Sequence, residues 1–195
     1  SLLLKGVGLT KRFGGLTALD GVDIVLQAGE VLGLIGENGA GKSTLIHLLT
    51  GSYACDAGYI DNAGHPQGQG VAVVHQDPQL IASLSGLDNL FIGRTFPSFA
   101  LGTLISRSQM RSQALAACSE VGFVLPLDSL VLDYTPTQRF QLALLRCVMQ
   151  QPSVLILDEP TAALTSHDSE ELMQLISRWT RDGMAVLYVS HRLEE

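Results

Sequence analysis

The chain has 195 residues, 46% hydrophobic and 16% charged, so it is long enough for one domain with a sizeable core and too apolar for global disorder. Its formal net charge of −7 argues against a general nucleic-acid binder, which normally presents a basic face. Cys55, Cys118 and Cys147 lack the spacing of a metal site or disulfide framework and predict reduced thiols of a cytosolic protein. No stretch is apolar enough for a membrane span, so we expect any membrane attachment to run through a partner.

The first third of the chain predicts short strands, one helix and many turns. Strands are expected at Leu2–Leu9, Val22–Gln27 and Val31–Ile35, with turns at Gly14-Gly15 and Ala28-Gly29. A helix should run from Lys42 to about Leu49 and end before Gly51. The turn-rich stretch from Gly58 to Gly70 flanks a small β segment, and Val71–His75 reads as a strand.

The middle of the chain, from Asp77 to about Gln150, has a different character. Helical periodicity covers Ser106–Val121 and Gln138–Met149, interrupted by Pro97 and Pro126, which predicts a helical subdomain inserted into an α/β core. The α/β pattern then returns as strand Val154–Asp158, helix Asp168–Arg181 and strand Ala185–Ser190. These last strands lack clean alternation, which is typical of a parallel sheet covered on both faces.

A phosphate-binding loop is predicted between the third strand and the first helix. Residues 36–44 read GENGAGKST directly after an apolar run. Gly36, Gly39 and Gly41 allow backbone conformations that turn several N–H groups toward one phosphate chain, and the following helix points its positive end at the same anion. Lys42 can reach the β- and γ-phosphates and Ser43 can coordinate Mg²⁺. The rest of the expected nucleotide shell is Glu37, Asn38, Ala40 and Thr44.

Two adjacent carboxylates close the strand at residues 154–158, at the edge where α/β sheets bind ligands. Side chains of neighbouring strand residues point in opposite directions, so one carboxylate can face a metal and the other the γ-phosphate and a water. We therefore expect Asp158 to be a magnesium ligand and Glu159 to polarise the attacking water. The alternative is a surface acidic pair after a core strand, which the upstream phosphate loop disfavours.

With these two motifs the chain resembles the ATP-binding subunits of ABC transporters over essentially its whole length. The phosphate loop matches their Walker A motif, and residues 155–161 match Walker B with its following Glu-Pro-Thr. The resemblance implies an α/β P-loop NTPase with a mostly parallel sheet core, an N-terminal antiparallel β subdomain and an inserted helical subdomain at about 77–150. It also implies that residues 1–195 form a single ATPase domain that is incomplete at its C-terminal end.

The resemblance assigns further site residues. Gln76 is similar to the glutamine of the Q-loop, which contacts Mg²⁺ or water and senses the membrane subunits. His191 resembles the switch histidine at the γ-phosphate, and Phe13 occupies the place of the aromatic residue that stacks on adenine. Residues 162–165 resemble the D-loop. The implied cofactors are ATP and Mg²⁺, with catalytic roles for Glu159, His191, Gln76 and Lys42 and metal contacts from Ser43, Gln76 and Asp158.

The signature loop departs from the family pattern. Where the family has Leu-Ser-Gly-Gly-Gln, this chain has Tyr-Thr-Pro-Thr-Gln at 134–138. In the family the loop caps the nucleotide held by the opposite subunit, so Thr135, Thr137 and Gln138 are expected there. Pro136 removes an N–H donor and Thr137 adds a Cβ where close approach is needed. The composite site completed by this loop is therefore expected to turn over slowly; the alternative is that the altered loop still caps adequately.

The residues of these motifs most resemble those of the N-terminal ATPase half of simple-sugar importers. This implies coupling of ATP hydrolysis to solute uptake, with a second ATPase domain as homo- or heterodimer partner, transmembrane permease subunits and, indirectly, a periplasmic or surface solute-binding protein. It places the chain on the cytoplasmic face of the membrane, peripherally, with no nucleic-acid partner. A non-transport ABC ATPase and a regulatory ATP binder with weak hydrolysis stay open as alternatives. A dinucleotide-binding dehydrogenase is excluded, because the loop carries Lys-Ser instead of GxGxxG.

Overall fold

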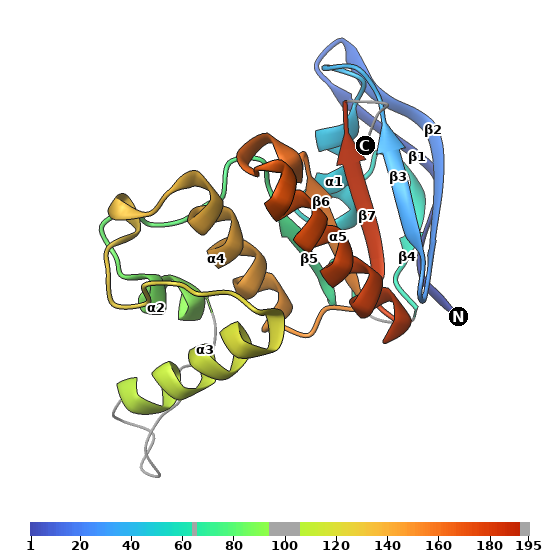
Figure 1. The fold of residues 1–195 in the computed structure, drawn as a ribbon. Helices are drawn as coiled ribbons and strands as arrows, with labels where there is room; N and C mark the ends of the chain where they lie inside the picture. The colour runs from blue at the N-terminus through green and yellow to red at the C-terminus, as the bar shows by residue number, and fades with distance from the viewer. Residues whose placement is uncertain (64–65, 94–105, 192–195) are drawn as a thin grey trace.

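The computed structural model describes residues 1–63, 66–93 and 106–191. Pro97 and residues 192–195 lie outside the described residues. Two sheets organise the chain (Figure 1). No helix in the described part of the chain has the length and apolar character needed to cross a membrane. All three cysteines are free, as predicted.

The central sheet has four parallel strands. Their spatial order is β3 (Val31–Ile35), β7 (Ala185–Ser190), β6 (Val154–Asp158) and β5 (Val71–Val74). The bounds of β3, β6 and β7 match the sequence prediction, and β5 ends one residue early. Since β6 and β7 are buried almost throughout, their uninterrupted apolar character is that of strands covered on both faces.

The two faces of the central sheet have separate hydrophobic cores. Leu155 and Leu157 of β6 pack with the helices of the middle region and with α5 (Ser166–Arg181). Val154 and Ile156 point the other way and pack with α1 (Lys42–Leu49) and the N-terminal strands. The alternation along β6 thus puts helices on one face, and α1 with a second sheet on the other.

The second sheet is antiparallel, in the order β2 (Leu16–Gln27), β1 (Leu2–Phe13) and β4 (Ala57–Asp61). β1 and β2 are longer than predicted and meet at the Gly14-Gly15 turn. A shift of register between Leu9 and Lys11 lets β2 continue through Gly21, which lies just before the predicted strand start at Val22.

The middle region is helical, as predicted, and lies to one side of the sheet (Figure 1). It holds α2 (Gly86–Phe91), α3 (Arg107–Val121) and α4 (Pro136–Val148), with a 3₁₀ turn η1 (Val131–Asp133) before α4. Where α3 ends, the Arg178 guanidinium of α5 donates to the Glu120 carbonyl oxygen at 2.8 Å, which ties this region to the sheet's covering helix.

Two helices begin earlier than predicted. α4 starts at Pro136, and α5 starts at Ser166, after the 3₁₀ turn η2 (Pro160–Ala163). Thr135 and Thr165 are the N-caps, and each forms a reciprocal capping box with the residue three positions on, Gln138 and Asp168. The fold is therefore the predicted α/β P-loop NTPase fold.

Candidate functional site

The loop between β3 and α1 has the conformation of a phosphate cradle. Gly39 and Gly41 have φ values of 86° and 88°, which other residues rarely adopt. A Cβ at Gly41 would also lie 2.5 Å from the Ala18 carbonyl oxygen, so only glycine fits there. Gly36 is not among the residues with positive φ, so the left-handed conformation belongs to Gly39 and Gly41.

Lys42 folds back over this loop. Its Nζ donates to the carbonyl oxygens of Gly36 and Glu37, the latter at 3.0 Å. The ammonium group is therefore held at the mouth of the cradle by these two main-chain acceptors. An anionic phosphate entering the loop meets a positive charge that is already positioned, together with the N-terminus of α1.

A pocket of 550 Å³ opens above the loop and gathers residues from four separate segments. It brings together the predicted residues Phe13, Asn38, Gly39, Gly41, Lys42, Ser43, Thr44, Gln76, Asp158 and Glu159. Gln76 reaches it from the end of β5, and the two carboxylates from the end of β6, because parallel strands place their carboxyl ends at one edge.

Sequence reasoning missed one part of the pocket lining. Leu16, Thr17 and Ala18 at the start of β2 also face the pocket. The Gly14-Gly15 turn is the signal that points to them, because a two-residue hairpin turn brings Leu16 directly opposite Phe13. The pocket is thus closed on the Phe13 side by both strands of the hairpin.

Asp158 and Glu159 are not arranged as neighbouring strand residues. Asp158 ends β6, but Glu159 has φ 50° and ψ 50°, a left-handed conformation outside the strand. The expectation that the two carboxylates alternate on an extended strand is therefore wrong, although both line the pocket. The Glu159 N–H donates to the Val189 carbonyl oxygen at 2.9 Å, which fixes this turn against β7.

Burial raises the pKa of the Asp158 carboxyl, and the neighbouring Glu159 acts in the same direction. His75, Lys42 and His47 oppose the shift. Burial lowers the pKa of His75, while Asp158 opposes that change. A carboxylate held in a partly buried site with incomplete compensation has a physical reason to bind a cation.

The oxygen set around Asp158 fits Mg²⁺. It consists of the Asp158 carboxylate, the Ser43 hydroxyl and the Gln76 amide in one pocket beside the phosphate loop. Mg²⁺ is commonly held by one or two carboxylates together with substrate phosphates and water, and not by an all-protein cage. The described residues contain no cluster of three or more His, Cys, Asp or Glu side chains able to hold a metal.

His191 contacts the second carboxylate. Its Nδ1 lies 3.0 Å from Glu159 Oε1, and the Glu159 side chain is only 13% exposed. His191 follows directly after β7, whose last residue pairs with Ile35 just before the phosphate loop. The topology therefore brings the predicted switch histidine to Glu159 at the rim of the pocket.

Four rings form a row beside α1. Phe13 meets Tyr53 at 5.7 Å between ring centroids in an edge-to-face arrangement. Tyr53 lies 4.7 Å from His47, and His47 lies 6.2 Å from His75. Sequence reasoning singled out only Phe13 of these, because the four positions have no fixed spacing and meet only in the fold.

The signature residues lie away from this pocket. Thr135 and Gln138 form the capping box of α4, and the Thr137 hydroxyl donates to the Ala163 carbonyl oxygen at 3.2 Å. Tyr134 is buried and donates to the Pro126 carbonyl oxygen at 2.8 Å, and burial raises its pKa to about 12. Within this chain Thr135, Thr137 and Gln138 therefore do not join the site of Lys42.

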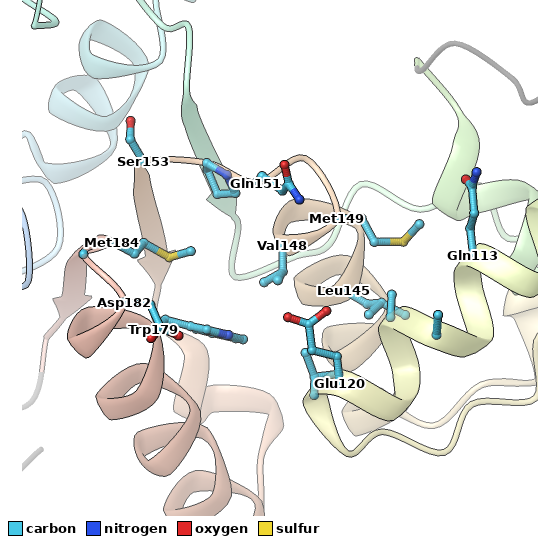
Figure 2. A pocket seen from close by; sticks show the side chains of 15 residues that line it. Gln113, Glu120, Leu145, Val148, Met149, Gln151, Ser153, Trp179, Asp182 and Met184 are labelled. Carbon is cyan, nitrogen blue, oxygen red and sulfur yellow. The ribbon is translucent and has the colours of Figure 1, made fainter.

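A second hollow, of 610 Å³, lies far from this chemistry. Figure 2 shows it between α3, α4 and α5, with Trp179 and Met184 on one side and Gln113 on the other. It is slightly larger than the phosphate-loop pocket, but its lining has no phosphate-binding loop and no basic side chain. The phosphate-loop pocket is identified as the functional site by the polar and charged side chains that meet in it, and not by its volume.

The geometry agrees with comparisons to known proteins. A family model described as ABC transporter matches residues 19–162. Ribose import ATP-binding protein RbsA 2 of Rubrobacter xylanophilus is 39% identical over 96% of this chain and 38% of its own length. The ribose import ATP-binding protein RbsA of Caldanaerobacter subterraneus subsp. tengcongensis is 35% identical over 99% of this chain and 40% of its own length. The chain thus spans about two fifths of these curated relatives.

Solved structures show the same fold. A nucleotide-free ATP-binding cassette from an ABC transporter superposes with a TM-score of 0.85 at 25% identity, over all of this chain and 83% of that one. A dimeric ATP-binding cassette in a post-hydrolysis state, bound to ADP and Pi, has a TM-score of 0.84 at 22% identity, over 98% of this chain and 89% of that one. From the matched residues and the shared fold, the chain belongs to the ABC transporter family.

Proposed function

We propose that the chain binds Mg·ATP and hydrolyses it as the ATP-binding part of an importer for a simple sugar. The single observation that carries the proposal is the pocket in which Lys42, Ser43, Asp158 and Glu159 converge around the phosphate loop. The names of the relatives, which are ribose import proteins, support a sugar as solute.

Each part of the pocket has a defined task. The loop N–H groups and Lys42 hold the β- and γ-phosphates, and Phe13 stacks on the base. Ser43, Asp158 and Gln76 would hold Mg²⁺, which would supply positive charge beside the phosphates. Glu159 accepts a hydrogen bond from the attacking water, and His191 holds the Glu159 carboxylate in place.

The proposed partners follow from the same role. A second ATPase domain would place its signature loop over this pocket, and the loop at 134–138 would cover the partner's nucleotide. Transmembrane permease subunits would receive the motion through the Gln76 loop and the helical region, and a solute-binding protein would deliver the sugar. The chain then sits peripherally on the cytoplasmic face of the membrane.

Replacement of Glu159 by Gln tests the hydrolytic role. Glu159→Gln should slow phosphate release by at least about 100-fold, because the general base is lost, while Mg·ATP binding is retained. Glu171→Gln is the matched control: Glu171 also pairs with a histidine, His167, at 3.3 Å, but on the exposed surface of α5. Equal phosphate release from Glu159→Gln and Glu171→Gln would contradict the proposal.

A regulatory ATP binder is the second candidate, and the engagement of the signature hydroxyls within the chain favours it. Binding of a fluorescent ATP analogue without any phosphate release from the wild-type chain would support this candidate over hydrolysis. Transport is tested separately by recovery of the chain with membrane vesicles that contain a sugar permease. Release of phosphate without such association would favour a non-transport ABC ATPase.

A further inference from the structure

Tyr53 lies in the loop after α1 and contacts Phe13, the side chain on which the base of ATP is proposed to stack. The two rings meet at 5.7 Å with an interplanar angle of 69°. Edge-to-face pairs of this kind are favoured by the charge distribution of aromatic rings and hold the relative orientation of both rings. Tyr53 itself is not among the residues that line the pocket.

Phe13 needs such support. It is the last residue of β1, directly before the Gly14-Gly15 turn, and it is 44% exposed. The Lys11 ammonium lies 5.6 Å from the ring centroid and is held by Asp56 at 3.0 Å. The contacts with Tyr53 and Lys11 therefore help to hold the orientation of this half-exposed ring.

Tyr53 is in turn attached to the helix that carries the phosphate site. Its N–H donates to the His47 carbonyl oxygen at 3.0 Å, and its ring lies 4.7 Å from the His47 ring. The Gln67 side chain donates to the Leu48 carbonyl oxygen at 2.7 Å, beside the same loop. α1 begins with Lys42 and Ser43, so one rigid element sets the positions of both the phosphate ligands and Tyr53.

We propose that Tyr53 is a positioning residue for the base of the bound nucleotide. It fixes the Phe13 ring at a set distance from the phosphate loop, so that the ring is ready to stack before ATP arrives. The proposal rests on the proposed function, since it presupposes ATP in the pocket. Its consequence is that Tyr53 contributes to binding of the nucleoside part and leaves binding of the phosphates unchanged.

Calorimetry with two ligands on the full chain tests this division. Tyr53→Ala should raise the Kd of Mg·ATP about three- to tenfold, the range expected for loss of one aromatic pair, and leave the Kd of Mg·tripolyphosphate unchanged. Tyr53→Phe keeps the ring and should restore wild-type affinity for Mg·ATP. Tyr59→Ala removes an exposed tyrosine on β4 and serves as the matched control, with both affinities unchanged.

Several results would overturn the proposal. One is an unchanged Kd of Mg·ATP in Tyr53→Ala. Another is an equal loss for both ligands in a variant whose thermal unfolding matches wild type; Tyr53→Leu replaces Tyr53→Ala if the latter unfolds early. If either result is found while wild type binds tripolyphosphate, Tyr53 is not a positioning residue and the proposed function stands. If wild type binds neither ligand, both fall.

Discussion

The left-handed backbone of Glu159 is the most strained feature among the residues proposed for catalysis. A residue with a Cβ in this conformation costs about 1–2 kcal/mol, and Glu159 has φ 50° and ψ 50°. Main-chain bonds hold it there: its N–H donates to Val189, and its carbonyl oxygen accepts from the Ala162 N–H at 3.2 Å. The strain aims the carboxylate into the pocket instead of along the strand.

Glycine should therefore be more stable than alanine at position 159. We expect Glu159→Gly to exceed Glu159→Ala by about 1 kcal/mol in free energy of unfolding, measured in urea, since glycine adopts positive φ without penalty. Glu170 in the interior of α5 provides the control, because there glycine should be less stable than alanine by about 1 kcal/mol. The same order at both positions would show that Glu159 is unstrained.

At this scale the sequence predicts residue types better than conformations. Lys42, Ser43 and Asp158 were predicted because each has a fixed place in a short motif. The conformation of Glu159 was not predicted, since it depends on bonds to β7, which lies far along the chain. Tyr53 was missed for the same reason: its contact with Phe13 joins two segments that no local pattern relates.

Among the elements, α5 begins with a carboxylate that stabilises its own first turn. Thr165 and Asp168 form a capping box, and the hydrogen bond from the Thr165 hydroxyl is the main cause that lowers the pKa of Asp168. A lowered pKa means that the folded chain favours the charged form. This stabilisation is present above the ordinary value of 3.8 and is lost as the pH falls through the lower folded pKa.

Asp168→Asn should therefore destabilise the chain at pH values where the Asp168 carboxyl is charged. We expect a loss of about 0.5 kcal/mol at pH 7, the size of a charge at a helix N-terminus, from urea unfolding curves. The difference from wild type should shrink as the pH is lowered below 3.8. Glu170→Gln, on the same helix, should cost less at pH 7; a pH-independent effect of Asp168→Asn would contradict the assignment.

Elements of the central sheet were predicted within a residue because their apolar runs have sharp ends. The helix start at Lys42 was predicted correctly, but those of α4 and α5 were predicted two residues late: Pro136 and Ser166 look like loop residues, yet both suit the first turn of a helix. β1 and β2 were predicted too short: β1 continues past Leu9 to the Gly14-Gly15 turn, and β2 begins before Gly21, where the register shifts. Sequence patterns thus misplace the end of a helix or strand where the residue type there is common both in loops and at the ends of such elements.

For the whole molecule, the signature loop predicts two unequal ATP sites in a heterodimer whose other ATPase domain keeps an unaltered loop. The Thr137 hydroxyl donates to the Ala163 carbonyl oxygen, so its proton is engaged inside the chain, while the Thr135 oxygen accepts the Gln138 N–H. Pro136 has no N–H to offer. Loss of one donor to a developing oxyanion typically costs roughly 3 kcal/mol of barrier, so the site completed by this loop should turn over slowly.

The asymmetry can be measured in the assembled dimer. Glu159→Gln in this chain should abolish most of the ATPase activity, because it disables the site with a complete set of residues. The equivalent change in the partner domain should cost far less, since that nucleotide faces the altered loop. Equal losses from the two changes would show that the altered loop still caps adequately.

The hydrogen bond from the Arg178 guanidinium to the Glu120 carbonyl oxygen joins the helical region to the helix that covers the sheet. The acceptor is a main-chain oxygen, so a change of side chain at position 120 leaves this hydrogen bond intact, whereas a residue other than arginine at position 178 removes the guanidinium donor. The hollow of Figure 2 lies between the same two helices, with Glu120 and Trp179 in its wall. A turn of the helical region away from α5 would therefore have to break this hydrogen bond and also separate apolar side chains that the two parts share in one core.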